Sequence, residues 1–198
     1  MSLNVQSLRL PQTAYLLAAG QSRRFGFNKA FAHWQGVPFL NYQLRLLRSC
    51  FVNVKVVAPA QETYRALGVN HALVDRFPEQ GPLAGLDTAL QDALQDDTRQ
   101  SPWLFLASCD TFGVFPEHIF RLSQSLANAT ASHEAVLWRN GQHIEPLWGF
   151  YATALGGRVE QRLCNGDLAM HGLLKQIQVK THDQNLNWIQ VNAPTDFP

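Results

Sequence analysis

The sequence has little charge, and the charges it has nearly cancel. Lysine and arginine number 16 against 15 aspartate and glutamate residues, so the formal net charge is +1, and charged residues make up only 16% of the 198-residue chain. Proteins that bind nucleic acid through its phosphates carry a marked positive excess. We therefore expect no nucleic-acid partner, and any positive charge that binds a ligand must be local.

Cysteine is also scarce, which argues against two classes of small protein. Cys50, Cys109 and Cys164 are far apart, odd in number and form no CxxC pair. Structural zinc sites commonly use such pairs, and small secreted domains use dense disulfide frameworks. A reducing cytoplasmic compartment fits this pattern better.

Long apolar runs are missing as well. The chain has no stretch of about 20 apolar residues, the length that a membrane-spanning helix needs. The start, MSLNVQSLRLPQ, lacks the basic residues and continuous apolar run of a signal peptide. We expect a cytoplasmic protein with no membrane association, in which residues 1–12 form a flexible N-terminal segment.

The residues that are present predict one α/β domain spanning 1–198. Hydrophobic residues make up 46% of the chain, enough for a sizeable core. Short apolar runs ending at Gly, Pro or Asp alternate with segments of helical spacing, which predicts a doubly wound, mostly parallel sheet with helices on both faces. Predicted strands cover 13–20, 52–59, 71–75, 103–110 and 187–194. Predicted helices cover 38–50, 82–94, 116–129, 156–166 and 168–177.

One further segment predicts a departure from the parallel pattern. The sequence EAVLWRNGQHIEPLWGFY contains RNGQ, Arg139 to Gln142, between two apolar runs. An Asn-Gly pair at such a place is typical of a tight hairpin turn. The sheet should therefore contain an antiparallel strand.

Four segments at predicted strand ends carry the residues suited to chemistry. Ligands of open α/β sheets bind beyond the carboxyl ends of the strands, where loops converge. The segments are AAGQSRRFGFNK, DRFPEQGPLAG, ASCDTFG and QVNAPTD.

The first segment, LLAAGQSRRFGFNK, runs from Leu16 to Lys29 and combines glycines with cations. It does not fit the phosphate-loop pattern GxxxxGK[ST], the dinucleotide pattern GxGxxG or the nucleophile pattern GxSxG. A turn of small residues can still bind phosphate oxygens through its N–H groups, with Arg24 and Lys29 adding charge. The alternative is an ordinary solvated basic loop.

The third segment places Asp110 at the end of a strongly apolar strand. A carboxylate there is costly unless it faces a cleft, accepts hydrogen bonds or holds a cation, although aspartate also simply forms turns. We interpret the adjacent Cys109 as packing and not as a nucleophile. His143 and Glu145 are too few for a metal site. They either face the second substrate or are structural polar residues, and we favour the structural role.

Together these segments resemble a known family. LLAAGQSRRFGFNK resembles the signature LA(G/A)GxSxRMGxxK of the Rossmann-like nucleotidyltransferase superfamily, and most closely that of the molybdenum cofactor guanylyltransferase family. GPLAG, ASCDTFG, EPLWGFY and QVNAPTDF resemble the family's GPLAG turn and its aCDmPf, ePLfalY and NxNTPeD motifs. The likeness runs from Ala14 to Phe197, and Asn28 stands where the family usually has aspartate.

The resemblance implies a nucleotidyltransferase that moves GMP from GTP to the phosphate of molybdopterin, with release of pyrophosphate. It implies catalytic roles for Lys29, Arg24 and Asp110, and Mg2+ bound by Asp110 and Asn192. The nucleotide-binding residues it implies are Leu17, Ala18, Ala19, Gly20, Lys29, Asp75, Gly81, Pro82 and Leu83. It also implies transient contacts with other molybdenum cofactor proteins.

Two other functions stay open from the sequence. Ala19, which is shared with cytidylyltransferase relatives, and Pro59, where the family commonly has an asparagine near guanine, allow a cytidylyltransferase acting on the molybdenum cofactor or on another phosphorylated acceptor. Thr111, Gly113 and Ala193 depart from the family motifs and allow a nucleotide-binding regulatory module without catalysis.

Overall fold

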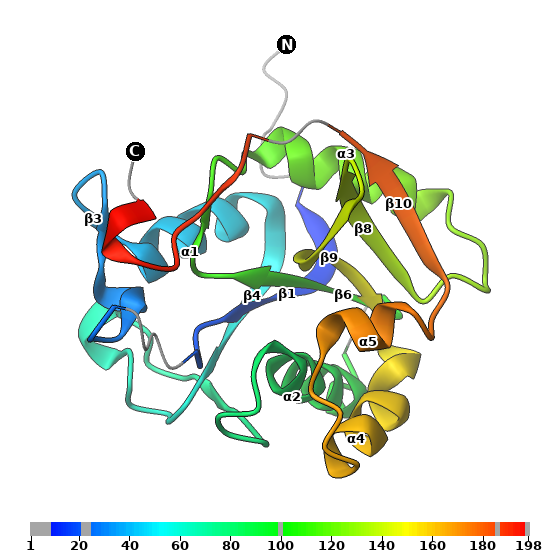
Figure 1. The fold of residues 1–198 in the computed structure, drawn as a ribbon, viewed down its shortest axis with the longest axis horizontal. Coiled ribbons are helices and arrows are strands. Elements are labelled where there is room, and N and C mark those ends of the chain that lie inside the picture. Colours follow the sequence, from blue (N-terminus) through cyan, green and yellow to red (C-terminus); the bar gives the residue numbers. More distant parts are fainter. Residues whose placement is uncertain (1–8, 21–24, 99–100, 185–186, 197–198) are drawn as a thin grey trace.

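The protein is built on a seven-stranded sheet with the order β10-β8-β9-β6-β1-β4-β5 (Figure 1). The computed structural model describes residues 9–20, 25–98, 101–184 and 187–196. The sheet consists of β1 (Leu10–Leu17), β4 (Phe51–Ala58), β5 (Leu73–Val74), β6 (Trp103–Ser108), β8 (Ala135–Asn140), β9 (His143–Ala152) and β10 (Val179–Asp183).

The sheet is mostly parallel, as the alternating pattern predicts. β1 pairs in parallel with β4 and β6, β4 pairs in parallel with β5, and β10 pairs in parallel with β8. β9 is antiparallel to both β6 and β8, which confirms the predicted antiparallel strand. Gly141 in the β8–β9 turn has a φ of 60°, a conformation that glycine adopts without steric cost.

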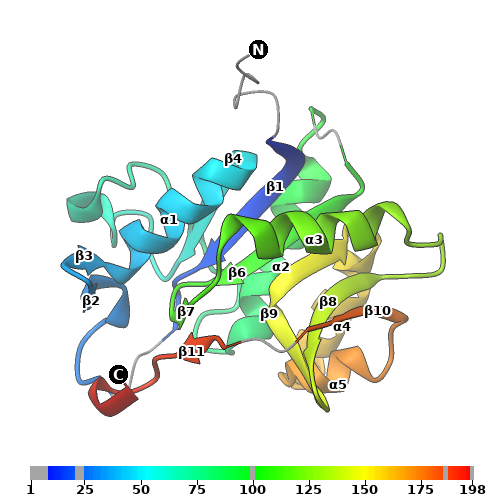
Figure 2. The same ribbon diagram turned by 90° about the horizontal axis from the view of Figure 1, so that it is seen from above.

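Helices cover both faces of the sheet (Figures 1 and 2). They are α1 (Phe39–Cys50), α2 (Pro82–Gln95), α3 (Pro116–Ala127), α4 (Gly156–Cys164) and α5 (Met170–Leu174). Apolar side chains of α1 and α3 belong to one buried cluster, and those of α2, α4 and α5 belong to another. Neighbouring residues of β1 alternate between the two, with Leu16 in the first and Tyr15 in the second. This alternation explains why the central strands are apolar throughout.

The beginning of α2 follows from its sequence. Pro82 is the first helical residue, where its fixed φ suits a helix and its missing N–H costs nothing. Gly81 before it has a φ of 79°. Gly85 in the first turns lies so close to β1 that a Cβ there would be 2.8 Å from Leu17 Cδ2. The two glycines therefore let α2 start directly beside the end of β1.

The structure corrects the prediction for residues 187–194. Only Ile189–Gln190 form a strand, β11, and it pairs antiparallel with β7 (Thr111–Phe112) outside the main sheet. Figure 2 shows these two strands side by side beyond the end of β6. β10 forms one edge of the main sheet, and it was not predicted as a strand because VKTHD is largely polar.

Short elements complete the fold. They are β2 (His33–Trp34) and β3 (Val37–Pro38), with the 3-10 turns η2 (Lys29–Phe31), η3 (Arg65–Leu67), η4 (Thr153–Leu155) and η5 (Pro194–Asp196). In the part of the chain that the structure describes, no helix is long and apolar enough to cross a membrane.

Candidate functional site

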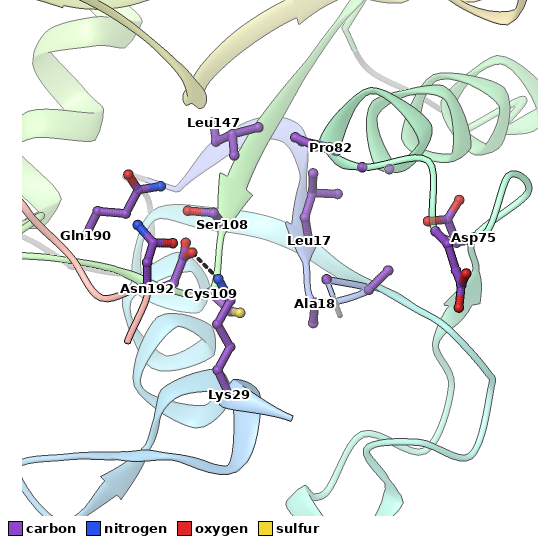
Figure 3. A pocket seen from close by; sticks show the side chains of 16 residues that line it. Leu17, Ala18, Lys29, Asp75, Pro82, Ser108, Cys109, Leu147, Gln190 and Asn192 are labelled. Carbon is purple, nitrogen blue, oxygen red and sulfur yellow. Dashed lines mark hydrogen bonds and ion pairs between the residues drawn. The ribbon is translucent and has the colours of Figure 1, made fainter. Parts of the chain in front are cut away.

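A cavity of about 520 Å³ lies beyond the carboxyl ends of β1 and β6 (Figure 3). One side, which we call the ion-pair wall, is formed by Lys29, Asp110 and Asn192. The other side, the loop wall, is formed by the cavity-lining residues of the segment 75–82. The end of β1 and the residues after it, 17–20, lie between the two walls. This is the place where an open α/β sheet binds ligands.

The cavity brings together most of the residues singled out by the sequence. Those that line it are Leu17, Ala18, Ala19, Gly20, Lys29, Asp75, Gly81, Pro82, Asp110 and Asn192. Leu83 does not line it, because its fully buried side chain packs in the core beneath α2. Arg24 lies outside the described residues. The functional roles of all the residues singled out from the sequence stay predictions.

Other lining residues were not singled out for binding. They are Glu79, Ser108, Cys109, Leu147 and Gln190. Gly85, which also lines the cavity, belongs to the GPLAG turn for which the resemblance implies a part in holding the nucleoside. Some of these residues could have been found from the sequence, because Glu79 lies within DRFPEQGPLAG, Cys109 precedes Asp110 and Leu147 lies within EPLWGFY. Gln190 lies in QVNAPTD, but only the pairing of β11 with β7 brings it to the cavity.

An ion pair between Lys29 and Asp110 is the main polar contact of the ion-pair wall (Figure 3). Lys29 begins η2, and Asp110 follows β6 by two residues. The Asp110 side chain is only 7% exposed. Its second oxygen, Oδ1, is buried and has no hydrogen-bond partner among the described residues. A buried carboxylate oxygen without a partner is costly, and a bound cation would satisfy it.

The position of Lys29 is fixed by its neighbour Asn28. The Asn28 side chain caps η2 by accepting a hydrogen bond from the N–H of Ala30 at 3.0 Å, and its amide donates to the Tyr64 hydroxyl at 3.0 Å. The Tyr64 hydroxyl in turn donates to the carbonyl of Ala18. Burial raises the pKa of Tyr64 to about 12, which keeps this hydroxyl a donor. Asn28 therefore connects the lysine to the end of β1.

Asn192 reaches Asp110 through backbone pairing. The N–H of Val191 donates to the carbonyl of Asp110 at 2.8 Å, next to the β7–β11 pair. The carboxylate of Asp196 accepts from the N–H groups of Asn192 and Ala193 at 2.7 and 2.8 Å, which shapes the turn. Residues 82 positions apart in sequence thus share one wall of the cavity.

Cys109 is buried at the end of β6, and its N–H donates to the carbonyl of Leu17 at 3.3 Å. Burial raises the pKa of its thiol to about 12. The reactive form of cysteine is the thiolate, so this thiol is inert near neutral pH. Cys109 therefore has a packing role, as its position in the sequence suggested.

On the loop wall, Asp75 is held by its own segment. Its side chain accepts a hydrogen bond from the N–H of Phe77 at 3.0 Å and another from Thr88. Burial, as the largest effect, raises the pKa of Asp75. Both contacts fix the carboxylate beside the start of α2.

The residue after Asp75 connects the loop wall to two helices. Arg76 binds the fully buried carboxylate of Asp87 in α2 at 2.8 Å and that of Glu160 in α4 at 2.7 Å. Burial is the largest effect on the Asp87 pKa and raises it, while Arg76 opposes that rise. Removing the arginine would leave a buried charge without a partner.

The ligand atoms around Asp110 suit a hard cation. Among the residues that the structure describes, no group of three or more His, Cys, Asp or Glu side chains could hold a metal ion, so no complete protein-only site is present there. Mg2+ prefers oxygen ligands and commonly takes one or two from the protein and the rest from water and substrate phosphates. The unpartnered Oδ1 of Asp110 and the side-chain oxygen of Asn192 fit that requirement.

Comparison with known proteins identifies the family. The profile of the MobA-like NTP transferase domain matches residues 14–182. A probable molybdenum cofactor guanylyltransferase of Geobacillus sp. is 28% identical over 192 residues, which cover 92% of this chain and 94% of that protein. One from Deinococcus radiodurans is 32% identical over 158 residues, which cover 80% and 76%.

The fold has a counterpart among solved structures. The crystal structure of molybdopterin-guanine dinucleotide biosynthesis protein A from Archaeoglobus fulgidus superposes with a TM-score of 0.75 at 18% identity, covering 93% of this chain and 94% of the other. Such a likeness supports the α/β nucleotidyltransferase-like fold. Because the domain profile matches most of the sequence, the chain belongs to the MobA-like NTP transferase domain family.

Proposed function

We propose that the protein transfers GMP from GTP to the phosphate of molybdopterin and releases pyrophosphate. Its family and the names of its relatives support a nucleotidyltransferase of this kind. The observation on which the proposal depends is the Lys29–Asp110 pair, which lines the cavity at the strand ends and leaves the buried Asp110 Oδ1 without a hydrogen-bond partner among the described residues. A cytoplasmic location and transient contacts with other molybdenum cofactor proteins belong to the same proposal.

The triphosphate would lie against the ion-pair wall. Lys29 supplies a positive charge there, and Ala18, Ala19 and Gly20 line the cavity with side chains too small to block an approaching phosphate. Arg24, outside the described residues, would add a second cation. We assign Mg2+ to Asp110 and Asn192, where it would neutralise negative charge on the reacting phosphates.

The reaction requires little covalent chemistry from the protein's side chains. The acceptor phosphate is already anionic near neutral pH, so no general base is needed to activate it. It attacks the α-phosphorus of GTP, forming a new P–O bond while the bond to pyrophosphate breaks. Positioning and charge neutralisation therefore account for catalysis, and Lys29 would stabilise the departing pyrophosphate.

Pyrophosphate release tests the proposal. The purified protein is given molybdopterin, Mg2+ and either GTP, CTP or ATP. Release with GTP alone supports guanylyl transfer, and release with CTP would replace it by cytidylyl transfer. Nucleotide binding without any release would instead favour the non-catalytic module.

Asp110→Asn then tests the site itself. The substitution keeps the size of the side chain but removes its charge, and turnover should fall about 100-fold to 1,000-fold. Asp92→Asn is the matched control, because Asp92 also pairs with a lysine, Lys55, at 2.6 Å, but outside the residues that line the cavity. Equal turnover in Asp110→Asn and the wild type would contradict the metal assignment.

A further inference from the structure

The two ends of the cavity differ in charge. On the ion-pair wall the charge of Asp110 is offset by the cation Lys29, whereas the two carboxylates that line the loop wall, Asp75 and Glu79, have no cation beside them among the residues that line the cavity. Carboxylates only accept hydrogen bonds and repel phosphates. If the cavity holds a nucleoside triphosphate, as the proposed function requires, its phosphates must lie toward Lys29. The nucleoside, which has hydrogen-bond donors and no charge, is left for the loop wall.

Of the two carboxylates, Glu79 is the one available to a ligand. Asp75 is buried and already accepts hydrogen bonds from the Phe77 N–H and from Thr88. Glu79 lies on the exposed rim and lines the same cavity. Figure 3 shows Leu17 between Lys29 and Asp75, and Leu17 and Pro82 of the loop wall both line the cavity, where they give a flat base an apolar surface.

The backbone of Glu79 is also unusual. Its φ is 68°, and among the described residues Gln35 is the only other non-glycine residue with a positive φ. Gln35 lies in the tight turn between β2 and β3, which explains its conformation. Glu79 belongs to no such hairpin. A side chain kept where glycine would fit with less strain is typical of a ligand site.

A carboxylate distinguishes the bases by their pattern of donors. On its Watson–Crick edge guanine presents two adjacent donors, N1–H and the 2-amino group, which both oxygens of one carboxylate can accept. Cytosine and adenine place a ring-nitrogen acceptor beside their single amino donor, so one carboxylate oxygen would face a lone pair. We propose that Glu79 selects guanine by accepting both donors of that edge, an assignment that rests on the proposed function.

Equilibrium binding of GTP, inosine triphosphate and CTP tests this assignment. Inosine triphosphate differs from GTP only by lacking the 2-amino group. The wild type should bind GTP about tenfold more tightly than inosine triphosphate, the value of one hydrogen bond to a partly solvated charge. Glu79→Gln and Glu79→Gly should reduce that ratio to below about twofold. Glu62→Gln, at an exposed glutamate that pairs with Arg65, should leave it unchanged.

Thermal unfolding without nucleotide separates binding from a structural role. Glu79→Gly should unfold at the wild-type temperature or above it, because glycine relieves the positive φ. A clear loss of stability would show that Glu79 is structural and would overturn the assignment, as would an unchanged GTP preference in Glu79→Gln.

The outcomes also separate this assignment from the proposed function. A wild type that binds GTP selectively through Glu79 but releases no pyrophosphate contradicts only the proposed reaction. A wild type that releases pyrophosphate from GTP, with full selectivity in Glu79→Gln, contradicts only the role of Glu79. Preference of the wild type for CTP, or no nucleotide binding at all, contradicts both.

Discussion

The two walls of the cavity are built in different ways. The ion-pair wall collects Lys29, Asp110 and Asn192 from three distant parts of the chain, whereas the loop wall is one segment, 75–82. The first therefore depends on long-range pairing and the second on local turns and the start of one helix. Chemistry on the first wall and recognition on the second should consequently respond to different substitutions.

Different interactions also hold the two walls in place. Behind the ion-pair wall, Phe112 of β7 stacks on Trp34 with ring centroids 4.3 Å apart and contacts Phe39 at 4.6 Å. The loop wall is held by the ion pairs of Arg76 with Asp87 and Glu160. Aromatic packing supports one wall and buried charge supports the other.

The largest effect is expected on the ion-pair wall. Lys29→Met keeps the length of the side chain but removes the cation that would stabilise pyrophosphate, so kcat should fall about 100-fold to 1,000-fold. The preference for GTP over inosine triphosphate should not change, because the loop wall is intact. Steady-state pyrophosphate release measures kcat, and equilibrium nucleotide binding measures the preference for GTP over inosine triphosphate. Lys55→Met, which breaks the Lys55–Asp92 pair, is the control and should keep its kcat.

On the loop wall, Arg76→Met should lower stability more than kcat. It leaves the fully buried Asp87 carboxylate without its counter-ion, and we expect a loss of about 2 kcal/mol in the free energy of unfolding at pH 8. Urea unfolding measures it. Arg158→Met, which breaks the exposed pair with Glu134, should lose less than about 0.5 kcal/mol.

The deficit of Arg76→Met should depend on pH. Burial raises the pKa of Asp87, and the nearby Glu160 raises it too, while Arg76 lowers it. Without the arginine, the folded-state pKa rises further above the unfolded value, so the folded protein binds more protons. The deficit should therefore shrink as pH falls through the folded-state pKa and be complete above it. An equal deficit at pH 5 and pH 8 would contradict this explanation.

Gly113→Ala tests the contact between the end of β7 and the segment that leads through β11 to Asn192. Gly113 has a φ of 82°, and a Cβ there would lie 3.0 Å from the carbonyl oxygen of Asn187. We expect a loss of about 1–2 kcal/mol in stability and a drop in turnover, because the segment leading to Asn192 must move. Gly166→Ala has a similar φ, 76°, but open space around it. It should lose stability while keeping full turnover.

The smallest effect is expected between the walls, at Gly85→Ala. The new Cβ would lie 2.8 Å from Leu17 Cδ2, at the flexible end of a side chain that lines the cavity. A gain in helix propensity of about 1 kcal/mol should offset the crowding, so stability should stay within about 1 kcal/mol. Nucleotide affinity should fall a few-fold. Gly157→Ala in α4, with open space around it, should leave affinity unchanged.

Much of the fold could be predicted from local pattern. The apolar run at 103–110 and the Pro82 helix start were both found where expected. The Asn-Gly turn likewise gave the hairpin of β8 and β9. Each of these signals lies within a few neighbouring residues, and backbone conformation is largely set at that range.

Other features could not be found in the same way. β10 is a polar strand at the sheet edge. It is defined by its pairing with β8, and its own residues show no apolar strand pattern. The prediction for 187–194 gave a strand without naming its partner, and only Ile189–Gln190 form one, paired with β7 outside the main sheet, because apolar pattern specifies neither partner nor length. Leu83 was assigned to the nucleotide, yet helix geometry turns its side chain into the core.

The sequence by itself determined the alternating architecture, the family and the loop wall, since each depends on contiguous residues. Tertiary structure alone decided that Asn192 and Asp110 line the same cavity and that Asn28 connects Lys29 to Ala18 through Tyr64. It also decided that one oxygen of Asp110 is buried without a hydrogen-bond partner among the described residues. The physical reason is that such contacts join residues distant in sequence. Their free energy comes from packing and hydrogen bonding in the completed fold, which no local pattern encodes.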